Sequence, residues 1–371
     1  AETAVVAPTS RMSDADVDNF VQLRQALEKF AEVLQKARED VAEALGADFN
    51  EIYFTSGGSE ADNQAIRSAA LFGAKKGKKH LISTKIEHHA VLHTLKKLER
   101  EGFEVTLLDV GADGIVDPAD VEKAIREDTA LVTIMYANNE IGTLQPIDEI
   151  AKICKEKKVT FHTDAVQAFG QVPINVDELG IDMLSSSGHK LNGPKGIGFI
   201  YINEKAKVKP IIFGGEQQKN MRSGTENVPG IAGIGLAAKT IYTDLDEKVA
   251  HMRALKQHFI EGVQKIDHTV IHGLYDETSA PHIISVGFAG IRSEVLLHTL
   301  EEKGIYVSSG SACASNHPAI SGVLKGIGAG KEYLDATLRF SMSEFTTEEE
   351  IDYTLETLYN CVPMLRKYTR H

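Results

Sequence analysis

Cysteine is scarce in this sequence, which contains three among 371 residues. Three cysteines cannot form a disulfide framework, and this favours a reducing compartment, so we expect a cytoplasmic protein. Long apolar runs are also lacking: no stretch of about 18 apolar residues occurs, and no membrane-spanning segment is expected. Because no short apolar run follows basic residues near the N-terminus, no secretory signal is predicted either.

Positive charge is in deficit, with 40 basic against 53 acidic residues and a net charge of −13. An acidic surface repels phosphate backbones, so general nucleic-acid binding is not expected. The 42% hydrophobic and 25% charged residues are ordinary for a globular protein. They exclude a disordered chain, a collagen and a coiled coil. At about 150 residues per domain, the length predicts two or three domains.

Glycine is absent from the first 45 residues, and apolar residues recur at helical spacing over 23–45. We expect one long helix that Gly46 ends. From residue 51 the pattern changes, because short β-rich runs alternate with helical stretches, the βαβ pattern of an α/β domain. The seven β-rich runs are 51–56, 80–85, 103–110, 130–137, 159–165, 183–188 and 196–202.

After about residue 240 the elements become sparser. A long amphipathic helix is predicted over 244–266 and a final helix from residue 346. Between them lie short runs at 282–288, 293–304, 305–310 and 336–342. We interpret this part as a second, smaller α+β domain, with a soft boundary because no Pro/Gly/Ser linker marks it.

Ligands of open α/β sheets bind outside the carboxyl ends of the strands, which directs attention to the residues after each run. The first run leads into Gly57, Gly58 and Ser59 and then a predicted helix. Two glycines allow close backbone approach, and the free N–H groups of a helix N-terminus suit a phosphate. The same turn also fits an ordinary connection with Ser59 as N-cap and Asp62 closing a capping box.

Three further runs end in side chains that suit cofactor chemistry. His88 follows the second run and could stack on a flat ring or move protons, or be a histidine without a role. Asp164 ends the fifth run, with Gln167 one helical step on; its carboxylate fits either a protonated ring nitrogen or a helix cap. Lys190 follows the sixth run, where desolvation would make it an amine nucleophile for Schiff-base chemistry. A plain loop lysine, such as the nearby Lys195, is the alternative.

The three cysteines differ in their settings. Cys154 and Cys361 lie at core positions of predicted helices and are expected to be inert. Cys313 lies in the small-residue segment 307–316, where flexibility and exposure favour a reactive thiolate, although a non-reactive loop thiol fits as well. A phosphate cradle, a stacking histidine, an acid for a ring nitrogen and a Schiff-base lysine together describe a pyridoxal phosphate site. Together with such a site, a mobile cysteine such as Cys313 indicates a reaction that involves sulfur.

Eight segments carry a resemblance to a known family, and the match runs from roughly residue 31 to residue 365. The segments are TSGGSEADN, IEHHAVLHTL, ANNEIGTLQP, TDAVQAFG, SSSGHKLNGPKGIG, MRSGTENVPG, SSGSACAS and LRFSMSEFTTEEEID. Together they resemble the cysteine desulfurases, which are fold-type I pyridoxal phosphate enzymes. The long segment after Cys313 resembles the iron–sulfur-assembly and nitrogen-fixation branch.

The resemblance implies an α/β fold with two domains. A large domain over 31–240 would bind the cofactor on a mostly parallel seven-stranded sheet. A small α+β domain over 241–371 would carry the cysteine loop. Residues 1–30 form an atypical N-terminal segment, because the family's usual Asp-Asn-Ala-Ala-Thr-Thr and Gly-Asn-Pro-Ser-Ser-x-His runs do not occur there. A second departure is Glu216, which stands where a third glycine usually follows Gly214 and Gly215.

The resemblance also implies which residues hold pyridoxal 5′-phosphate. Lys190 would bind it covalently, and His88 would stack on its ring and transfer protons. Asp164 would pair with the ring nitrogen, and Gln167 would hydrogen-bond the ring hydroxyl oxygen. The residues implied for the phosphate are Gly58, Ser59, Ser187 and His189.

Substrate and partners follow from the same resemblance. Asn139 and Arg339 would bind L-cysteine, Arg339 by a bidentate pair with its carboxylate. Cys313 would take the sulfur as a persulfide, leaving alanine, and pass it to an acceptor such as an iron–sulfur scaffold protein. Thr225 would reach the phosphate of the neighbouring subunit, which implies a homodimer. No resident metal is expected, with Cys313 able to act as a transient iron–sulfur ligand.

Two other functions stay open at this point. A related pyridoxal phosphate lyase or aminotransferase would use Lys190 without Cys313. An interaction subunit with impaired catalysis would explain the altered N-terminus, although intact Lys190, Asp164 and Cys313 argue against it.

Overall fold

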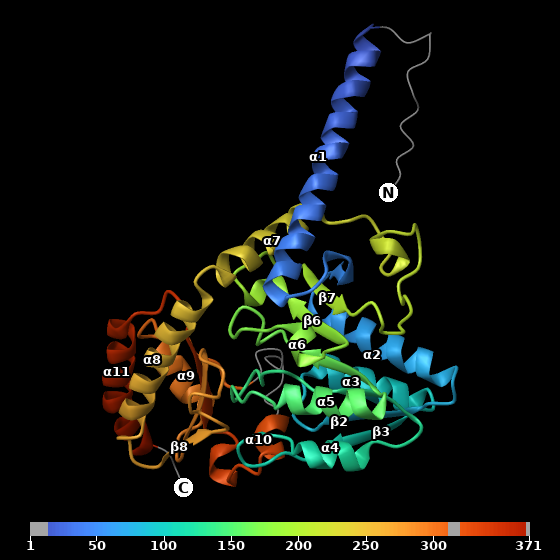
Figure 1. Ribbon diagram of the computed structural model, residues 1–371. Helices are drawn as coiled ribbons and strands as arrows, with labels where there is room; N and C mark the ends of the chain where they lie inside the picture. The colour runs from blue at the N-terminus through green and yellow to red at the C-terminus, as the bar shows by residue number, and fades with distance from the viewer. Residues whose placement is uncertain (1–13, 311–319, 369–371) are drawn as a thin grey trace.

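A computed structural model describes residues 14–310 and 320–368 (Figure 1). Its larger part is built on a sheet of seven strands in the order β1-β7-β6-β5-β4-β2-β3. Strand β7 pairs antiparallel with β1 and β6, and the other pairs of neighbours are parallel, which confirms the expected mostly parallel sheet. Each strand overlaps one predicted run: β1 (Ile52–Thr55), β2 (His80–Thr84), β3 (Glu104–Leu108), β4 (Thr129–Thr133), β5 (Thr160–Asp164), β6 (Met183–Ser187) and β7 (Gly198–Ile202).

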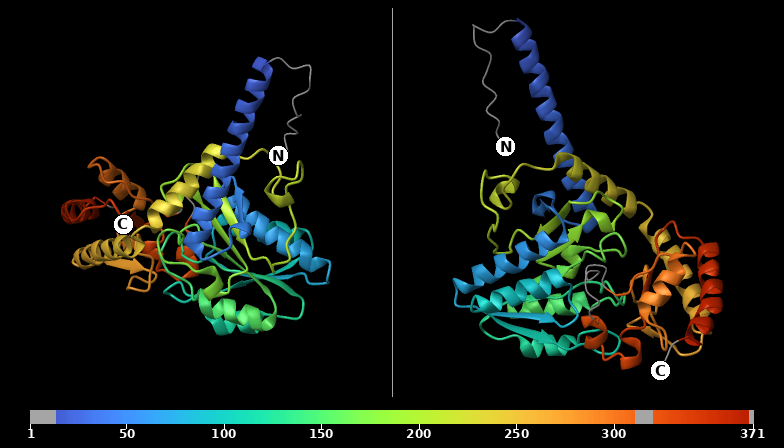
Figure 2. Two further views of the ribbon diagram at one scale, coloured as in Figure 1. Left: turned by 45° about the horizontal axis from the view of Figure 1, so that its top comes forward. Right: turned by 180° about the vertical axis from the view of Figure 1, so that it is seen from behind.

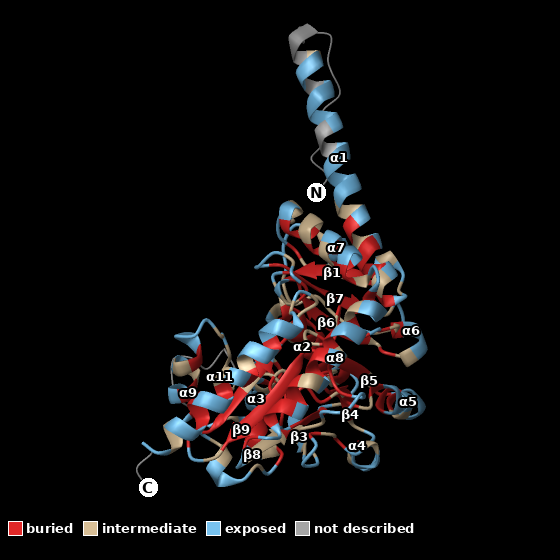
Figure 3. Cartoon of the chain, turned by 90° about the vertical axis from the view of Figure 1, so that its left-hand side faces the viewer, coloured by how far each residue is buried: buried red, intermediate tan, exposed pale blue. Residues whose placement is uncertain are grey.

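Helices cover both faces of this sheet, so its central strands are buried on both sides (Figure 3). Side chains alternate along a strand: in β7, Phe199 and Tyr201 join one core, whereas Ile200 and Ile202 join the other. This double burial explains why several of the predicted runs carry apolar residues on both faces. The helices of this part are α2 (Gly58–Ala74), α3 (His89–Arg100), α4 (Pro118–Ala124), α5 (Ile147–Lys157), α6 (Val176–Leu179) and α7 (Val228–Tyr242).

The predicted long N-terminal helix is present as α1 (Asp14–Leu45). Its last turns bury Ala37, Val41 and Leu45 and pack against α7, while its earlier turns extend away from the rest of the chain (Figure 1). Gly46 ends the helix with a φ of 65°, a left-handed conformation that costs glycine little. Within the described residues, no helix combines the length and apolar character needed to cross a membrane.

Most described elements from α8 (Leu245–Val263) onward form a second group around a three-stranded antiparallel sheet (Figure 2), whereas Val323 and Leu324 pack with Ile86 and Ile141 of the larger part. Phe259, Val286, Leu338 and Leu358 contribute to its core. The strand order is β10-β9-β8. The elements are β8 (Thr269–His272), β9 (Ile283–Phe288), α9 (Ser293–Glu301), α10 (Gly322–Gly326), β10 (Thr337–Ser341) and α11 (Glu348–Arg366).

Some local features differ from the sequence-based expectation. The run 305–310 forms an isolated bridge between Ser308 and Arg339 rather than a strand. Strand β8 and helix α7 were not predicted. Glu216, which stands where the family usually has a third glycine, has a φ of 65°. This left-handed conformation is one that glycine adopts easily.

Candidate active site

A cavity of about 340 Å³ opens beyond the carboxyl ends of β5 and β6, where an α/β sheet is expected to bind its ligand. Its walls come from the β1–α2 turn, the loops after β2 and β4, and strand β10 of the small sheet. Ten of the predicted site residues line it: Gly58, Ser59, His88, Asn139, Asp164, Gln167, Ser187, His189, Lys190 and Arg339. Segments far apart in the sequence therefore meet at one place.

The β1–α2 turn is shaped by two glycines. Gly57 is the N-cap of α2 with a φ of 150°, and a Cβ on Gly58 would lie 2.7 Å from Val166 Cγ2. The turn therefore brings the first N–H groups of α2 to the cavity without a side chain in front of them. The capping-box alternative is wrong, because Ser59 lies inside the first turn and Asp62 is buried against the sheet.

The end of β6 and the residues after it place two polar side chains and a lysine in the cavity wall, with Ser187 beside the β1–α2 turn. Ser187 Oγ lies 2.8 Å from His189 Nδ1. Partial burial lowers the pKa of His189, with the charges of Lys190 and Lys195 acting in the same direction. Lys190 is half-buried and lines the cavity, whereas Lys195 is exposed and does not. Of the two lysines, only Lys190 is placed to react with a ligand in this cavity.

His88 lies at the N-terminus of α3. Its Nδ1 accepts a hydrogen bond from Ala90 N at 3.2 Å, which leaves the ring proton on Nε2. Burial lowers the pKa of His88, and the charges of His89, Lys190 and His93 lower it further. The imidazole is therefore neutral at pH 7 and can exchange a proton through Nε2.

Asp164, the last residue of β5, is 5% exposed. Its Oδ1 accepts from Val166 N at 3.0 Å, and a turn rather than a helix follows, so the helix-cap alternative does not hold. Burial raises the pKa of Asp164 to about 6, opposed by the Val166 N–H and by Lys190. Nearby, His282 Nε2 lies 3.3 Å from Gln167 Oε1, and it donates to that oxygen in the tautomer that carries the ring proton on Nε2.

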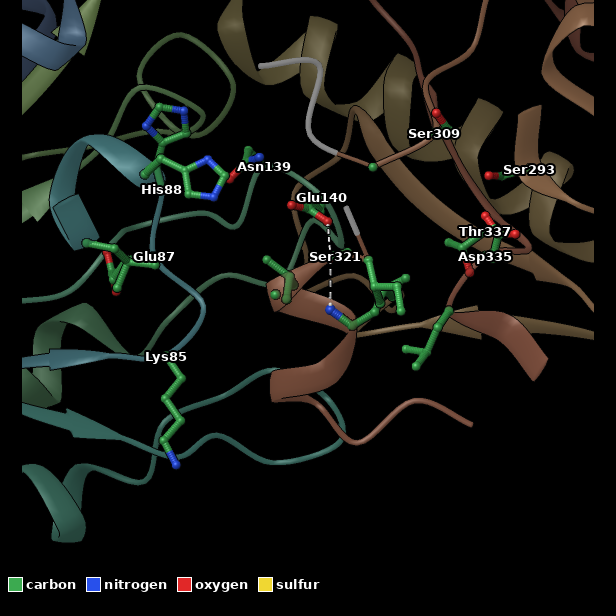
Figure 4. Close-up of a pocket in the computed structure, with 18 of the residues that line it drawn as sticks. Lys85, Glu87, His88, Asn139, Glu140, Ser293, Ser309, Ser321, Asp335 and Thr337 are labelled. Carbon is green, nitrogen blue, oxygen red and sulfur yellow. Dashed lines mark hydrogen bonds between the residues drawn. The ribbon is translucent and has the colours of Figure 1, made fainter. Parts of the chain in front are cut away.

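Arg339 brings the small sheet into the site. From β10 its Nη1 donates to the carbonyl oxygen of Asn139 at 2.8 Å, and both residues line the cavity. Figure 4 shows the adjoining pocket of about 160 Å³, with His88 and Asn139 on one side and Ser309 and Thr337 of the small part on the other. The two parts of the chain therefore share the walls of the site.

Of the two remaining predicted site residues, Thr225 does not line the cavity. Thr225 is exposed on the loop before α7. Cys313 lies outside the described residues. Cys154 and Cys361 are buried in helices, as predicted. Burial raises the pKa of both thiols, that of Cys154 to about 12, so neither forms a thiolate readily.

A group of buried polar residues behind the cavity was not predicted from the sequence. Asp62 lies between the cavity and strand β5, and His162, Ser185 and Glu87 surround it. Asp62 had one detectable signal: it follows Gly58 by four residues, and so shares its face of α2. One atom each of Asp62, His88 and Asp164 lies within 4.8 Å of the others, a set that suits a cation or a protonated ring nitrogen.

The sequence matches the family Aminotransferase class-V over residues 6–354, and the fold with a lysine-lined cavity at the strand ends agrees with that match. Cysteine desulfurase IscS from Dictyoglomus turgidum is 45% identical over 333 residues, 90% of this chain and 84% of that protein. A solved NifS-like protein has a TM-score of 0.85 at 37% identity, covering 91% of this chain and 89% of that one. The structure of SspA in complex with cysteine has a TM-score of 0.74 at 36% identity, covering 86% of this chain and 89% of that one.

Within that class, the chain belongs to the cysteine desulfurase family, whose members are pyridoxal phosphate enzymes. The predicted family, fold and enzyme class are confirmed by these matches.

Proposed function

We propose that this chain uses pyridoxal 5′-phosphate to take the sulfur from L-cysteine, releases L-alanine, and carries the sulfur as a persulfide on Cys313. The observation that best supports this proposal is that Lys190, Asp164 and Gly58 line one cavity to which Arg339 also contributes. The relative solved in complex with cysteine supports L-cysteine as the substrate.

The residues of the cavity fit the cofactor. Gly58 leaves no room for a Cβ, as expected where backbone N–H groups approach a phosphate closely. Ser59, Ser187 and His189 would complete the phosphate site. Asp164 is buried, and a buried carboxylate is unfavourable unless a positive group such as a protonated ring nitrogen pairs with it. When bound, the cofactor supplies an electron sink for negative charge at the substrate Cα.

Gln167 is oriented for the ring hydroxyl by His282. Burial lowers the pKa of His282 to about 3, so its ring is neutral and its Nε2–H can donate to Gln167 Oε1. The Gln167 amide NH₂ then serves as the donor to the ring hydroxyl oxygen. Asp164 at the ring nitrogen and the Gln167 amide at the ring hydroxyl would hold the ring from two sides.

Arg339 and Asn139 would hold the substrate. The guanidinium group binds the carboxylate of L-cysteine by a charge-assisted pair, while its Nη1 stays anchored on the Asn139 carbonyl oxygen. The Lys190 amine then removes the Cα proton. His88 keeps its proton on Nε2, because Nδ1 accepts from the backbone, and exchanges it with the substrate thiol.

The sulfur is transferred by nucleophilic attack. The Cys313 thiolate forms an S–S bond with the substrate sulfur as the C–S bond breaks, and the electron pair stays on carbon, which is protonated to give alanine. We infer that the persulfide passes to an acceptor such as an iron–sulfur scaffold protein, that Cys313 can transiently ligate a cluster, and that no metal is resident. We also infer a homodimer in which Thr225, exposed and outside its own cavity, reaches the partner's phosphate.

A cytoplasmic setting is part of the proposal. Cys154 and Cys361 are free thiols, as is usual in a reducing compartment.

Reduction of the holoenzyme with borohydride, followed by peptide mass analysis, tests the cofactor assignment. The peptide that contains Lys190 should carry the reduced cofactor in the wild type and in Lys195→Ala, and no peptide should carry it in Lys190→Ala. Cofactor attached at Lys195, or a wild type that binds none, would show that the proposed function is wrong.

Incubation with L-cysteine then separates desulfurase from lyase or aminotransferase activity. The wild type and the Cys154→Ser control should form alanine and carry one added sulfur atom on the Cys313 peptide. Cys313→Ser should keep the cofactor and form no persulfide. Undiminished turnover by Cys313→Ser would instead favour the related lyase.

A further inference from the structure

A second carboxyl group lies beside Asp164 in the wall of the cavity. Asp62, one helical turn after Gly58, lines the cavity and is 1% exposed. Its Oδ1 has no hydrogen-bond partner among the residues that the structure describes. Such an oxygen needs an explanation, because an unpaired carboxylate is costly in the interior of a protein.

Within the described part of the chain, the neighbouring His162 does not compensate the charge of Asp62. His162 Nε2 lies 3.8 Å from Asp62 Oδ1, but burial lowers the pKa of His162 to about 3 and its ring is neutral. Both ring nitrogens also have neutral partners: Nδ1 lies 2.8 Å from Thr133 Oγ1 and Nε2 lies 2.9 Å from Ser185 Oγ. His162 therefore orders the strands beneath Asp62 without acting as its counter-ion.

The other groups that face Asp62 disfavour its ionisation. Burial raises the pKa of Asp62 well above its usual value, with Asp164 on β5 and Glu87 in the loop before α3 acting in the same direction; the Ser185 hydroxyl opposes them. His88, within 4.8 Å, is neutral. The positive charge of Lys190 lowers the pKa of Asp164, which makes Asp164 the anionic member of the two.

We propose that Asp62 is a positioning residue that stays protonated beside Asp164, so that the two side chains present a single negative charge to the protonated ring nitrogen. This inference rests on the proposed function. One buried negative charge matches one positive ring, whereas a second would lie in the interior without a partner. The neutral carboxyl group of Asp62 can donate its proton toward Asp164 and hold that carboxylate in place.

Two substitutions at this position separate the possible roles. Asp62→Asn is isosteric, uncharged and still able to donate, so cofactor affinity and the absorbance maximum of the bound cofactor should stay close to wild type. Asp62→Ala should weaken the affinity of the cofactor-free protein for pyridoxal phosphate by about tenfold or more, because a donor to a charged group is lost. Asp182→Asn, outside the cavity, is the matched control and should leave affinity unchanged.

Two results would overturn the proposal. Weakened binding by Asp62→Asn, comparable with that of Asp164→Asn, would mean that Asp62 acts as an anion. Wild-type affinity of Asp62→Ala would mean that Asp62 does not position Asp164. In both cases a folded variant, verified by circular dichroism, is compared with the wild type.

The pH dependence of unfolding tests the protonation of Asp62 without any cofactor. An unfolded aspartate has a pKa of about 3.9, and the native pKa is higher, so the native wild type binds more protons above about pH 4. Its stability should therefore fall relative to Asp62→Asn as pH rises from about 5 to 8, by up to about tenfold in the folded-to-unfolded ratio per pH unit. Parallel curves would refute a protonated Asp62, and a wild type that binds no pyridoxal phosphate would instead contradict the proposed function.

Discussion

At the scale of single residues, the first turn of α2 decides between two interpretations that the sequence leaves open. Ser59 and Asp62 have capping-box spacing, yet Gly57 is the N-cap and Asp62 is buried. The spacing also allowed the second interpretation, in which Asp62 lines the ligand site, because Gly58 and Asp62 are four residues apart and share a face of α2. What spacing cannot supply is the buried surroundings of Asp62, which come from β4, β5 and β6 through tertiary packing.

Gly58 gives a testable consequence at this scale. A Cβ there would lie 2.7 Å from Val166 Cγ2, and a β-branched side chain has little freedom to move away. Gly58→Ala should therefore displace the turn and weaken pyridoxal phosphate binding, by about tenfold if the steric cost is about 1.4 kcal/mol. Affinity is measured by titrating the cofactor-free protein and following visible absorbance.

A double variant provides the control for Gly58. Val166→Ala removes the Cγ2 that a new Cβ would strike, so Gly58→Ala/Val166→Ala should recover most of the affinity. Gly322→Ala, where a Cβ meets nothing within 4 Å, should bind as the wild type does. Equal affinity of Gly58→Ala and the wild type would show that the phosphate does not need this glycine.

At the scale of elements, burial determines which strands and helices the sequence reveals. The central strands are buried on both faces, and short β-rich runs predict them well, although β2 and β6 end in polar residues. Strand β8 escapes detection because its four residues are mostly half-exposed and lack both alternation and a continuous apolar run. Helix α7 escapes detection because it contains glycines, which lower helix propensity.

The glycines of α7 have a structural purpose that sequence propensity does not show. A Cβ on Gly235 would lie 2.6 Å from Ala37 Cα, so glycine permits the close packing of α7 on α1. Although Gly→Ala usually stabilises a helix by about 1 kcal/mol, Gly235→Ala should lower the free energy of unfolding by about 1 to 3 kcal/mol. Urea unfolding measures this, with Gly322→Ala as the unhindered control; a variant as stable as the wild type would mean that α1 does not pack here.

At the scale of the whole molecule, the site combines residues that no local pattern relates. Lys190 and Asp164 follow strands of the large sheet and could be predicted from strand ends, and their catalytic roles remain predictions. The contact of Arg339 with Asn139 joins residues 200 positions apart, so the resemblance suggested both residues but not their contact. We propose that the domain boundary lies near residue 240, since α7 ends at Tyr242 and the small core begins with Leu255.

The contact between the two parts predicts how the molecule selects its substrate. Arg339 reaches the cavity from β10 and is anchored by the Asn139 carbonyl oxygen at 2.8 Å. A planar guanidinium can keep that anchor and still bind a carboxylate, whereas the single ammonium of lysine has no such fork. Arg339→Lys should therefore raise the KM for L-cysteine by about tenfold or more, the loss of one charge-assisted hydrogen bond, with cofactor absorbance unchanged.

A substrate analogue separates this role from a general disturbance of the site. Cysteamine has the thiol and amine of cysteine but no carboxylate, so its binding, followed by the change in visible absorbance, should be equally strong in the wild type and in Arg339→Lys. Arg292→Lys, on the exposed surface of the small part, is the matched control and should bind both compounds as the wild type does. If Arg339→Lys weakened cysteamine and L-cysteine alike, the arginine would maintain the contact between the two parts rather than recognise the carboxylate.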